Sequence, residues 1–275
     1  MRIKFYGTRG SIPVSDPGFM EFGGNTTCVF VSGFDEGFGK VIMDAGTGIR
    51  NLGKDIVGGK IDIDDIISLG FTHFHWDHIQ GFPFFAPAYS PDSKIQISTA
   101  GKRKVHNLKD IFSAQMQSIY FPVQLENMGA QIEFEKIETN VLVGEKGAIV
   151  RVADLQHPGG CIGIRFEINN KSVVFCTDVE HSNGIDENVV NLSMNADVLI
   201  HDAKYTDEEL KTHKGWGHSS YNQAIEVAVK AKVKQLIITH HDPDHDDDFL
   251  RAMERKCQER FEDLIFASDN YEINF

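Results

Sequence analysis

The chain has 275 residues, of which 41% are hydrophobic and 24% are charged, and its formal net charge is −13. No apolar run approaches the ~18 residues that cross a bilayer, so we expect no membrane-spanning segment. Proteins that bind long nucleic acids usually carry a basic surface, and 27 basic against 40 acidic residues argue against that class of partner. The N-terminus, MRIKFYGTRG, lacks the apolar core of a signal peptide, so we expect a cytoplasmic protein.

Apolar runs with the length of β-strands recur along the whole chain. Helical spacing occurs at 48–56, 102–117, 219–231 and 246–261. Strands interleaved with helices indicate α/β layers rather than a helical bundle or an all-β barrel. The expected strands are 3–7, 27–33, 40–46, 65–73, 94–99, 131–137, 148–157, 161–168, 172–178, 197–203, 235–241, 264–268 and 271–275.

Two local runs of charge stand out. The basic residues Lys102, Arg103, Lys104 and Lys109 are interpreted as a solvated helix face, with a local phosphate contact as the alternative. The acidic run at 246–248 is predicted to open a helix, where negative charge complements the helix dipole.

The densest group of metal-binding residue types lies in THFHWDHIQGF, residues 72–82. Three histidines and one aspartate fall within six positions at the end of a predicted strand: His73, His75, Asp77 and His78. Strand side chains alternate, so His73 and His75 are expected on one side, with Phe74 and Trp76 packed on the other. A helix that begins near Asp77 would turn Asp77 and His78 back toward the same space. A run of surface histidines is the alternative.

Three further ligand-type residues end predicted strands. His157 precedes the turn Pro158-Gly159-Gly160, Asp178 ends SVVFCTD, and His240 ends QLIITH. Loops beyond strand ends converge in α/β sheets, so these residues can meet the histidine cluster. One catalytic zinc needs only three protein ligands, and seven candidates suit two metals that share a carboxylate. Imidazole and carboxylate suit zinc, with manganese or iron as alternatives.

The order HxHxDH, then His157, Asp178 and His240 at strand ends, resembles the metallo-β-lactamase superfamily. Asp44 in MDAGTG resembles the first motif of that superfamily, a carboxylate that braces the metal loops. The resemblance covers nearly the whole chain. It implies an αββα sandwich of two mixed β-sheets flanked by helices, as a single hydrolase domain over residues 1–275.

The resemblance also implies how two metal ions would be held. Asp178 would bridge them, and His241 would be left out, because residues 240 and 241 face opposite ways on a strand and the family pattern favours His240. His241 and His245 are then expected at the polar surface or behind the ligands. The first metal would take His73, His75, His157 and Asp178, and the second Asp77, His78, Asp178 and His240.

Two segments resemble motifs of the tRNase Z branch. ADVLIHDAKY, residues 196–205, resembles its HEAT box, and GHSS, residues 217–220, resembles its His-Ser-Thr box. In that branch the carboxylate of the first box, here Asp202, orients the histidine of the second, here His218. The histidine then protonates the leaving oxygen, which an alkoxide requires. The alternative is that His218 only neighbours a helix cap, because a serine of that box could cap the helix unaided.

The expected function follows from how the chain departs from tRNase Z. It has no long Gly-rich, basic insertion resembling the tRNA-gripping arm, and its acidity argues against a large polyanion. YGTRGSIPV followed by GGNTTCV resembles small bacterial phosphodiesterases, including cyclic-nucleotide-type enzymes. We therefore expect a di-metal phosphodiesterase that hydrolyses a small diester, with a 3′,5′-cyclic nucleotide as the first candidate. In this reaction Asp77 would accept the proton of the attacking hydroxide. His218, oriented by Asp202, would donate a proton to the leaving sugar oxygen.

Three alternatives stay open at this point. The first is a tRNase Z-like nuclease, the second is a lactonase or other ester hydrolase, and the third is a non-enzymatic metal-binding or sensor module. The zinc β-lactamases carry a cysteine where this chain has Asp178, which argues against antibiotic hydrolysis. Related enzymes often form dimers, and a homodimer is left open.

Overall fold

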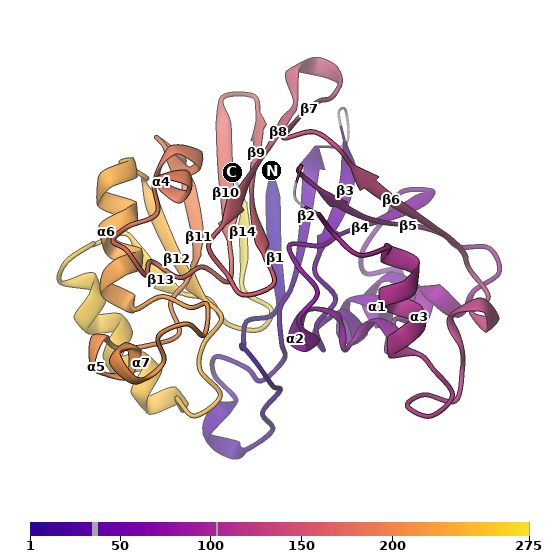
Figure 1. Ribbon diagram of the computed structural model, residues 1–275, viewed down its shortest axis with the longest axis horizontal. Helices are drawn as coiled ribbons and strands as arrows, with labels where there is room; N and C mark the ends of the chain where they lie inside the picture. The colour runs from indigo at the N-terminus through magenta and orange to yellow at the C-terminus, as the bar shows by residue number, and fades with distance from the viewer. Residues whose placement is uncertain (35–37, 103, 275) are drawn as a thin grey trace.

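The computed structural model describes residues 1–34, 38–102 and 104–274. Two seven-stranded β-sheets face each other in the middle of the molecule, and helices cover the two outer faces (Figure 1). The strand orders are β14-β1-β2-β3-β4-β5-β6 and β13-β12-β11-β10-β9-β8-β7. The predicted αββα sandwich of two mixed sheets is therefore confirmed.

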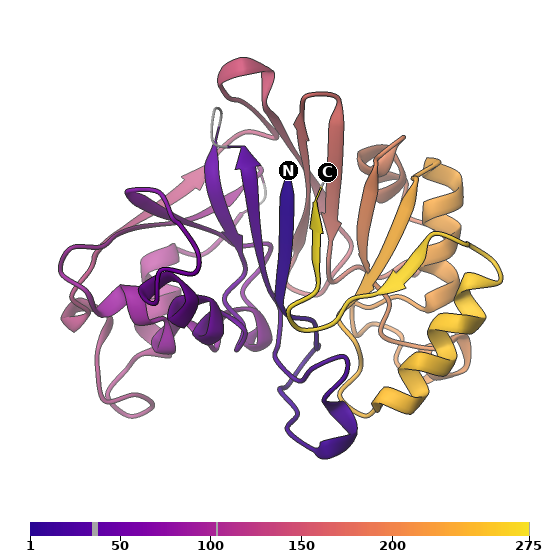
Figure 2. The same cartoon turned by 180° about the vertical axis from the view of Figure 1, so that it is seen from behind.

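The first sheet is antiparallel from β1 to β3 and parallel from β3 to β6. Strand β1 also pairs with β14, so the two ends of the chain lie side by side (Figure 2). Phe275, which closes the predicted last strand, lies outside the described residues. The strands are β1 (Arg2–Gly7), β2 (Cys28–Phe34), β3 (Gly39–Met43), β4 (Ile66–Gly70), β5 (Lys94–Ala100), β6 (Gln131–Ile137) and β14 (Glu272–Asn274).

The second sheet is antiparallel from β7 to β10 and parallel from β10 to β13. The short strand β7 was not among the predicted elements. The strands are β7 (Val141–Val143), β8 (Ile149–Leu155), β9 (Cys161–Ile168), β10 (Lys171–Cys176), β11 (Val198–Asp202), β12 (Gln235–Thr239) and β13 (Leu264–Phe266).

The helices divide between the two outer faces in sequence order (Figure 1). Those on the first sheet are α1 (Ile49–Val57), α2 (Trp76–Ile79) and α3 (Leu108–Gln115). Those on the second are α4 (Glu187–Ser193), α5 (Asp207–Thr212), α6 (Tyr221–Ala231) and α7 (Asp247–Gln258). The helix predicted over 102–117 begins only at Leu108, so Lys102 and Lys104 do not form a helix face, and Arg103 lies outside the described residues. The helices α4 and α5 were not predicted.

The apolar core forms three layers. Leu52 of α1 and Phe112 of α3 pack on the outer face of the first sheet. Phe5 and Ile162 lie between the sheets, and Val227 of α6 packs on the second sheet. Within the described residues, no helix combines the length and apolarity needed to cross a membrane.

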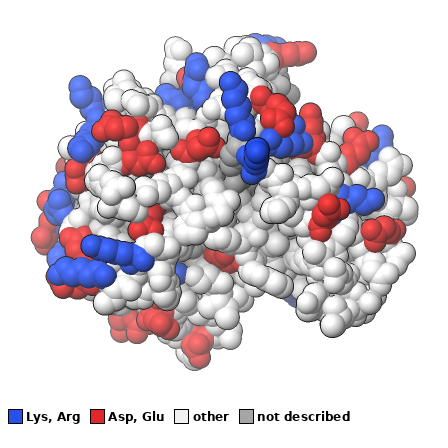
Figure 3. All heavy atoms as spheres, viewed as in Figure 1, with Lys and Arg blue, Asp and Glu red and all other residues white. Residues whose placement is uncertain are grey.

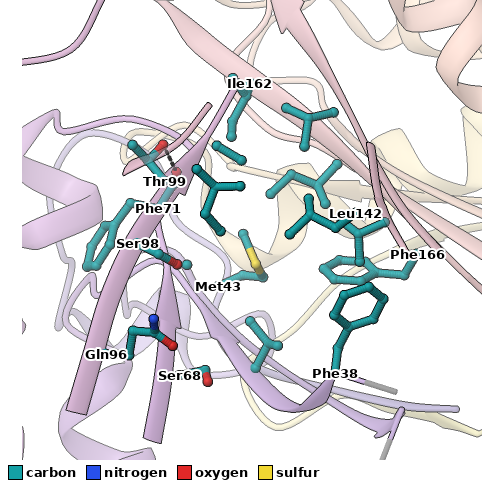
Figure 4. A pocket seen from close by; sticks show the side chains of 17 residues that line it. Phe38, Met43, Ser68, Phe71, Gln96, Ser98, Thr99, Leu142, Ile162 and Phe166 are labelled. Atoms are coloured by element: carbon teal, nitrogen blue, oxygen red, sulfur yellow. Dashed lines mark hydrogen bonds between the residues drawn. The ribbon is translucent and has the colours of Figure 1, made fainter. Parts of the chain in front are cut away.

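The inner faces of the sheets do not close completely between β3–β5 and β7–β9. Ser68 and Ser98 have small side chains and Gly70 has none, and a cavity of ≈ 240 Å³ remains between the sheets there (Figure 4). Its other walls include Phe38 and Phe166. None of the seven predicted metal ligands is among the described residues that line this cavity, so it is separate from the candidate site.

Candidate metal centre

The seven predicted ligands converge at one edge of the sandwich. Their ligand atoms form two groups, and within each group all of these atoms lie within 4.8 Å of one another. The first group is His73, His75, His157 and Asp178, and the second is Asp77, His78, Asp178 and His240. Asp178 belongs to both groups, as the bridging role requires. The structure thus brings together the residues that the sequence singled out, in the predicted division.

The HFHWDH residues span the end of the loop after β4 and the start of α2. Strand β4 ends at Gly70, so His73 and His75 lie on the loop and not on the strand, and strand alternation does not explain their direction. Their rings nevertheless share one space, with centroids 4.6 Å apart. Helix α2 begins at Trp76, one residue before the predicted start, and Asp77 and His78 are buried in it.

Trp76 does not pack where strand alternation placed it. Phe74 does pack, since its ring stacks on Phe71 with centroids 5.7 Å apart. Trp76 is 68% exposed. The prediction that Trp76 packs beside Phe74 is therefore wrong, because the chain changes from loop to helix between these two residues and the alternation ends there.

Three site residues adopt left-handed backbone conformations just after strands. Asp44 has φ 59°, Asp178 has φ 52° and His240 has φ 63°. Such conformations are uncommon outside glycine, although aspartate and histidine adopt them more often than most residues. They persist where the surrounding structure holds them, often at functional sites. His240 thus joins the ligands because the chain turns after β12, and not because of strand alternation.

The two other histidines of this segment are buried, which excludes the polar surface and leaves the other predicted position, behind the ligands. His241 is fully buried, and its Nε2 donates to the carbonyl oxygen of Ala267 at 2.8 Å. His245 is 6% exposed, with Nε2 2.9 Å from Glu209 Oε1 and Nδ1 3.2 Å from the Tyr221 hydroxyl. Both rings lie outside the two ligand groups.

Asp44 braces the ligand loop, as the resemblance implied. Its carboxylate accepts hydrogen bonds from Thr72 N at 2.9 Å and from Thr72 Oγ1 at 2.8 Å. Asp44 Oδ2 also lies 2.9 Å from His78 Nδ1, which leaves His78 Nε2 directed at Asp178 Oδ1, 3.2 Å away. A carboxylate on the far nitrogen of a histidine fixes the tautomer and orientation that a metal ligand needs.

The spacing of the ligand atoms fits bound metal ions. Among the described residues, buried His73 Nε2 has no hydrogen-bond partner and lies 3.6 Å from Asp178 Oδ2. His78 Nε2 and His240 Nε2 are 3.4 Å apart. Ligand atoms on a tetrahedral zinc ion, bonded at ~2.0–2.1 Å, stand roughly 3.3 Å from one another. With donors of imidazole and carboxylate type, the cluster can bind metal ions.

Burial lowers the pKa of two ligand histidines, whereas at His78 the carboxylates of Asp178, Asp77 and Asp44 outweigh burial and raise the pKa above its usual range. Burial lowers the pKa of His73, and it lowers that of His157 to about 4, so both rings are neutral as metal binding requires. Burial also opposes ionisation of Asp77, but His78 and His240 hold the pKa of that carboxyl below its usual range. Asp178 behaves in the same way. The site therefore concentrates negative charge that divalent cations would neutralise.

A buried carboxylate–histidine pair lies beside the second ligand group. His218 Nδ1 is 3.0 Å from Asp202 Oδ2, and the His218 ring stacks on His240 with centroids 4.8 Å apart. Burial raises the pKa of Asp202 and lowers that of His218 to about 4. The predicted contact between the two motif residues is thus present. Ser220 caps α6 in a capping box with Gln223, and His218 takes no part in that cap.

Three residues that sequence reasoning missed support the site. Ser11 N donates to Asp77 Oδ2 at 2.7 Å, and the buried Lys204 Nζ donates to Ser11 Oγ at 2.5 Å. Glu180 accepts hydrogen bonds from Gly215 N at 2.8 Å and Gly217 N at 2.9 Å. Ser11 and Lys204 lie inside the YGTRGS and HDAKY segments, and that position is the one signal that could have pointed to them.

A pocket of ≈ 300 Å³ adjoins the first ligand group. Its walls include His73 and His75, the glycines of the Pro158-Gly159-Gly160 turn, and Lys104 and His106 from the segment before α3. The predicted basic cluster therefore contributes one lysine to the surroundings of the site.

Comparisons with known proteins agree with this geometry. A family model described as "Beta-lactamase superfamily domain" matches residues 40–241, so the chain belongs to that superfamily. A ribonuclease Z from Listeria monocytogenes is 24% identical, with 98% of this chain and 97% of the relative covered. A ribonuclease BN from Proteus mirabilis is also 24% identical, with 98% of both chains covered.

Solved structures show the same fold. The short form of human tRNase Z has a TM-score of 0.68 at 20% identity, over 100% of this chain and 99% of the other. A diphosphatase from the PhnP family has a TM-score of 0.70 at 19% identity, over 100% and 97%. Family, fold and ligand cluster together define a metal-dependent hydrolase of the metallo-β-lactamase superfamily.

Proposed function

We propose that this protein is a di-metal phosphodiesterase that hydrolyses a small diester, with a 3′,5′-cyclic nucleotide as the first substrate to test. The observation that carries the proposal is the Asp202–His218 pair beside two ligand groups that share Asp178. The ligand groups alone would suit many hydrolases. A buried acid next to them suits a leaving alkoxide, which needs a proton as it departs.

The residues divide the reaction between them. Two divalent ions, zinc first and manganese or iron as alternatives, would stabilise the attacking and leaving oxygens when bound. Asp77, held by Ser11 N at 2.7 Å, accepts the proton of the attacking water. His218 uses Nδ1 for Asp202, so its Nε2 donates to the leaving sugar oxygen. The anionic diester favours the charged imidazolium form of His218, opposing the effect of burial on its pKa.

Charge and size support a small substrate. The net charge is −13, and acidic and basic side chains are interspersed over the face shown in Figure 3. Affinity for long nucleic acids comes largely from phosphate contacts with basic residues. The alignment with the Listeria ribonuclease Z runs over 319 residues, whereas this chain has 275, so that relative carries segments with no counterpart here.

A tRNase Z-like nuclease is the second candidate function. It is favoured by the coverage of 98% of this chain in the alignments with ribonuclease Z and ribonuclease BN. The Asp202–His218 pair would serve that reaction equally well, since its leaving group is also a sugar oxygen. The two candidates differ in the size of the substrate and in how steeply its binding falls with salt.

A substrate panel tests the proposal. The protein, loaded with zinc or with manganese, is assayed on cyclic nucleotides, linear diesters, a lactone and a tRNA precursor. We expect a cyclic mononucleotide to be hydrolysed better than structured RNA at physiological salt. Maturation of the tRNA precursor, without cyclic nucleotide turnover under either metal, would select the nuclease instead. Lactone hydrolysis that survives His218→Ala would select an ester hydrolase, and any metal-dependent turnover excludes a purely sensory role.

A further inference from the structure

Both tryptophans of the chain are exposed next to the candidate site. Trp76 is 68% exposed and Trp216 is 59% exposed. Trp76 lies between His75 and Asp77, and Trp216 directly precedes Gly217, whose carbonyl oxygen accepts a hydrogen bond from His157 Nδ1 at 2.8 Å. Burying an indole ring is ordinarily favourable. Leaving the indole of Trp216 in water, next to a residue that holds a metal ligand, points to a ligand that covers this ring.

The backbone on both sides of Trp216 is held in place. The buried Glu180 accepts from Gly215 N with Oε1 and from Gly217 N with Oε2, at 2.8 and 2.9 Å. Gly217 has φ +89°, and a Cβ there would lie 2.2 Å from His157 Nδ1, so this position requires glycine. The loop therefore presents the indole in a defined place beside the metal ligands.

A row of aromatic rings connects Trp216 to His218. The buried Tyr205 meets the His218 ring edge-on, with centroids 6.0 Å apart at 72°. His213 stacks on Tyr205 at 4.6 Å and 21°, and it meets Trp216 edge-on at 4.6 Å and 86°. The indole is thus supported from the protein side by His213, while more than half of its surface stays open to solvent. This arrangement matches the aromatic platforms on which proteins stack bases.

We propose that Trp216 is the platform on which the nucleobase of the substrate stacks. The inference rests on the proposed phosphodiesterase function and names what that site recognises: a base on the sugar whose oxygen His218 protonates. Stacking suits an acidic protein, because every base offers an apolar face and no further phosphate contact is needed. Loss of one such stack weakens binding by roughly 5- to 150-fold.

Kinetics with and without a base test the platform. Trp216→Ala and Trp216→Phe are compared on 3′,5′-cyclic AMP and on a ribose 3′,5′-cyclic phosphate that lacks the base. We expect Trp216→Ala to raise KM for cyclic AMP by roughly 5- to 150-fold, with kcat little changed. KM for the base-free substrate should be unchanged. KM for cyclic AMP in Trp216→Phe should return most of the way to the wild-type value. Equal losses on the two substrates would overturn the proposal.

A matched control removes a ring of similar exposure. Tyr120, in the segment after α3, is 68% exposed and lies outside the ligand groups and the rows of rings described above. Tyr120→Ala should leave KM for both substrates unchanged. A rise in KM for cyclic AMP equal to that of Trp216→Ala would also overturn the assignment of Trp216.

A binding measurement separates this inference from the proposed function. Trp76→Phe leaves Trp216 as the only tryptophan, so indole fluorescence reports on that ring alone. We expect saturable quenching of the metal-loaded variant by adenosine 5′-monophosphate and none by ribose 5-phosphate. Saturable quenching without cyclic nucleotide hydrolysis would keep the platform and reject the proposed substrate. Hydrolysis without saturable quenching would reject the platform and keep the proposed function.

Discussion

The two halves of the sandwich build the candidate site in different ways. The first sheet contributes its four ligands from one continuous segment, residues 73–78, which spans the end of the loop after β4 and the start of α2. The second sheet contributes one residue at a time, from the ends of β8, β10, β11 and β12 and from the loop before α6. These four strands run in the same direction, because β9 is antiparallel to both β8 and β10. Their ends therefore meet at one edge.

This difference predicts how far a substitution in each half disturbs the other site residues. In the first half, Asp44 holds Thr72 and His78, so one brace controls ligands of both groups. In the second half, each metal ligand follows a different strand, and links between these segments, such as that of His157 Nδ1 to Gly217 O, join them in pairs. A change at one end should therefore leave most of the others in place. Asp178 is the exception, because it belongs to both ligand groups.

Asp178→Ala should have the largest effect. We expect two metal ions per chain in the purified wild-type protein and the loss of both in the variant, because the shared carboxylate is removed. Activity should fall to background. Elemental analysis of undepleted protein measures the metal content, and at most one ion per wild-type chain would contradict the two-ion site.

A nearby histidine provides the control for Asp178. His181 is buried three residues further on, but its Nδ1 accepts a hydrogen bond from Asp186 N at 3.0 Å and it lies outside both ligand groups. His181→Gln should retain nearly all the metal. A loss that matches Asp178→Ala would mean that the ligand set is wrong.

His218→Ala should have the next largest effect, and only on poor leaving groups. General acid catalysis typically contributes ~10²–10⁴-fold, so cyclic nucleotide hydrolysis should slow by about that range. Hydrolysis of bis-nitrophenyl phosphate should slow far less, because nitrophenolate leaves without a proton. Asp202→Asn should show the same pattern more mildly, since it orients the ring. His75→Ala should damage both substrates alike, and equal losses for His218→Ala would show that His218 does not act as the acid.

The same contrast explains which parts of the site the sequence could predict. In the first half, the four ligands lie within six positions, so residue types and spacing alone reveal them. In the second half, the ligands His157, Asp178 and His240 are far apart in the chain. Their positions at predicted strand ends made them candidates, and the resemblance to a known superfamily then divided the ligands between two metal ions.

Other features depend on interactions that no local pattern encodes. The direction of the His240 side chain follows from the left-handed backbone of His240 itself, directly after β12. Strand alternation does not explain it. Trp76 is exposed because α2 starts at that residue. Glu180 acts through backbone N–H groups of a loop 35 residues away in the chain. The helices α4 and α5, with 7 and 6 residues, are too short for a clear helical period.

Asp44→Asn should weaken metal binding without abolishing it. Removing a carboxylate that orients a metal-binding histidine typically costs ~10–100-fold in affinity. Both ions should be affected together, because His73 follows Thr72 and belongs to the first group, while His78 belongs to the second. Competition with a chromophoric chelator measures the two affinities. Asp202→Asn is the comparison from the other half, and its metal affinities should stay close to those of the wild-type protein.

Ser220→Ala should have the smallest effect and should act on stability rather than chemistry. Ser220 Oγ accepts from Gln223 N at 3.3 Å and caps α6, directly after the segment that carries His218. Losing such a cap costs about 1 kcal/mol of unfolding free energy, which urea denaturation of the metal-loaded protein can measure. Asp246→Ala removes the corresponding cap of α7 and should cost a similar amount. Because Asp202 holds the His218 ring from β11, turnover of the Ser220 variant should stay near the wild-type value. A loss of activity as large as that of His218→Ala would mean that the cap positions the acid, and that the strand-end residues are less independent than their geometry indicates.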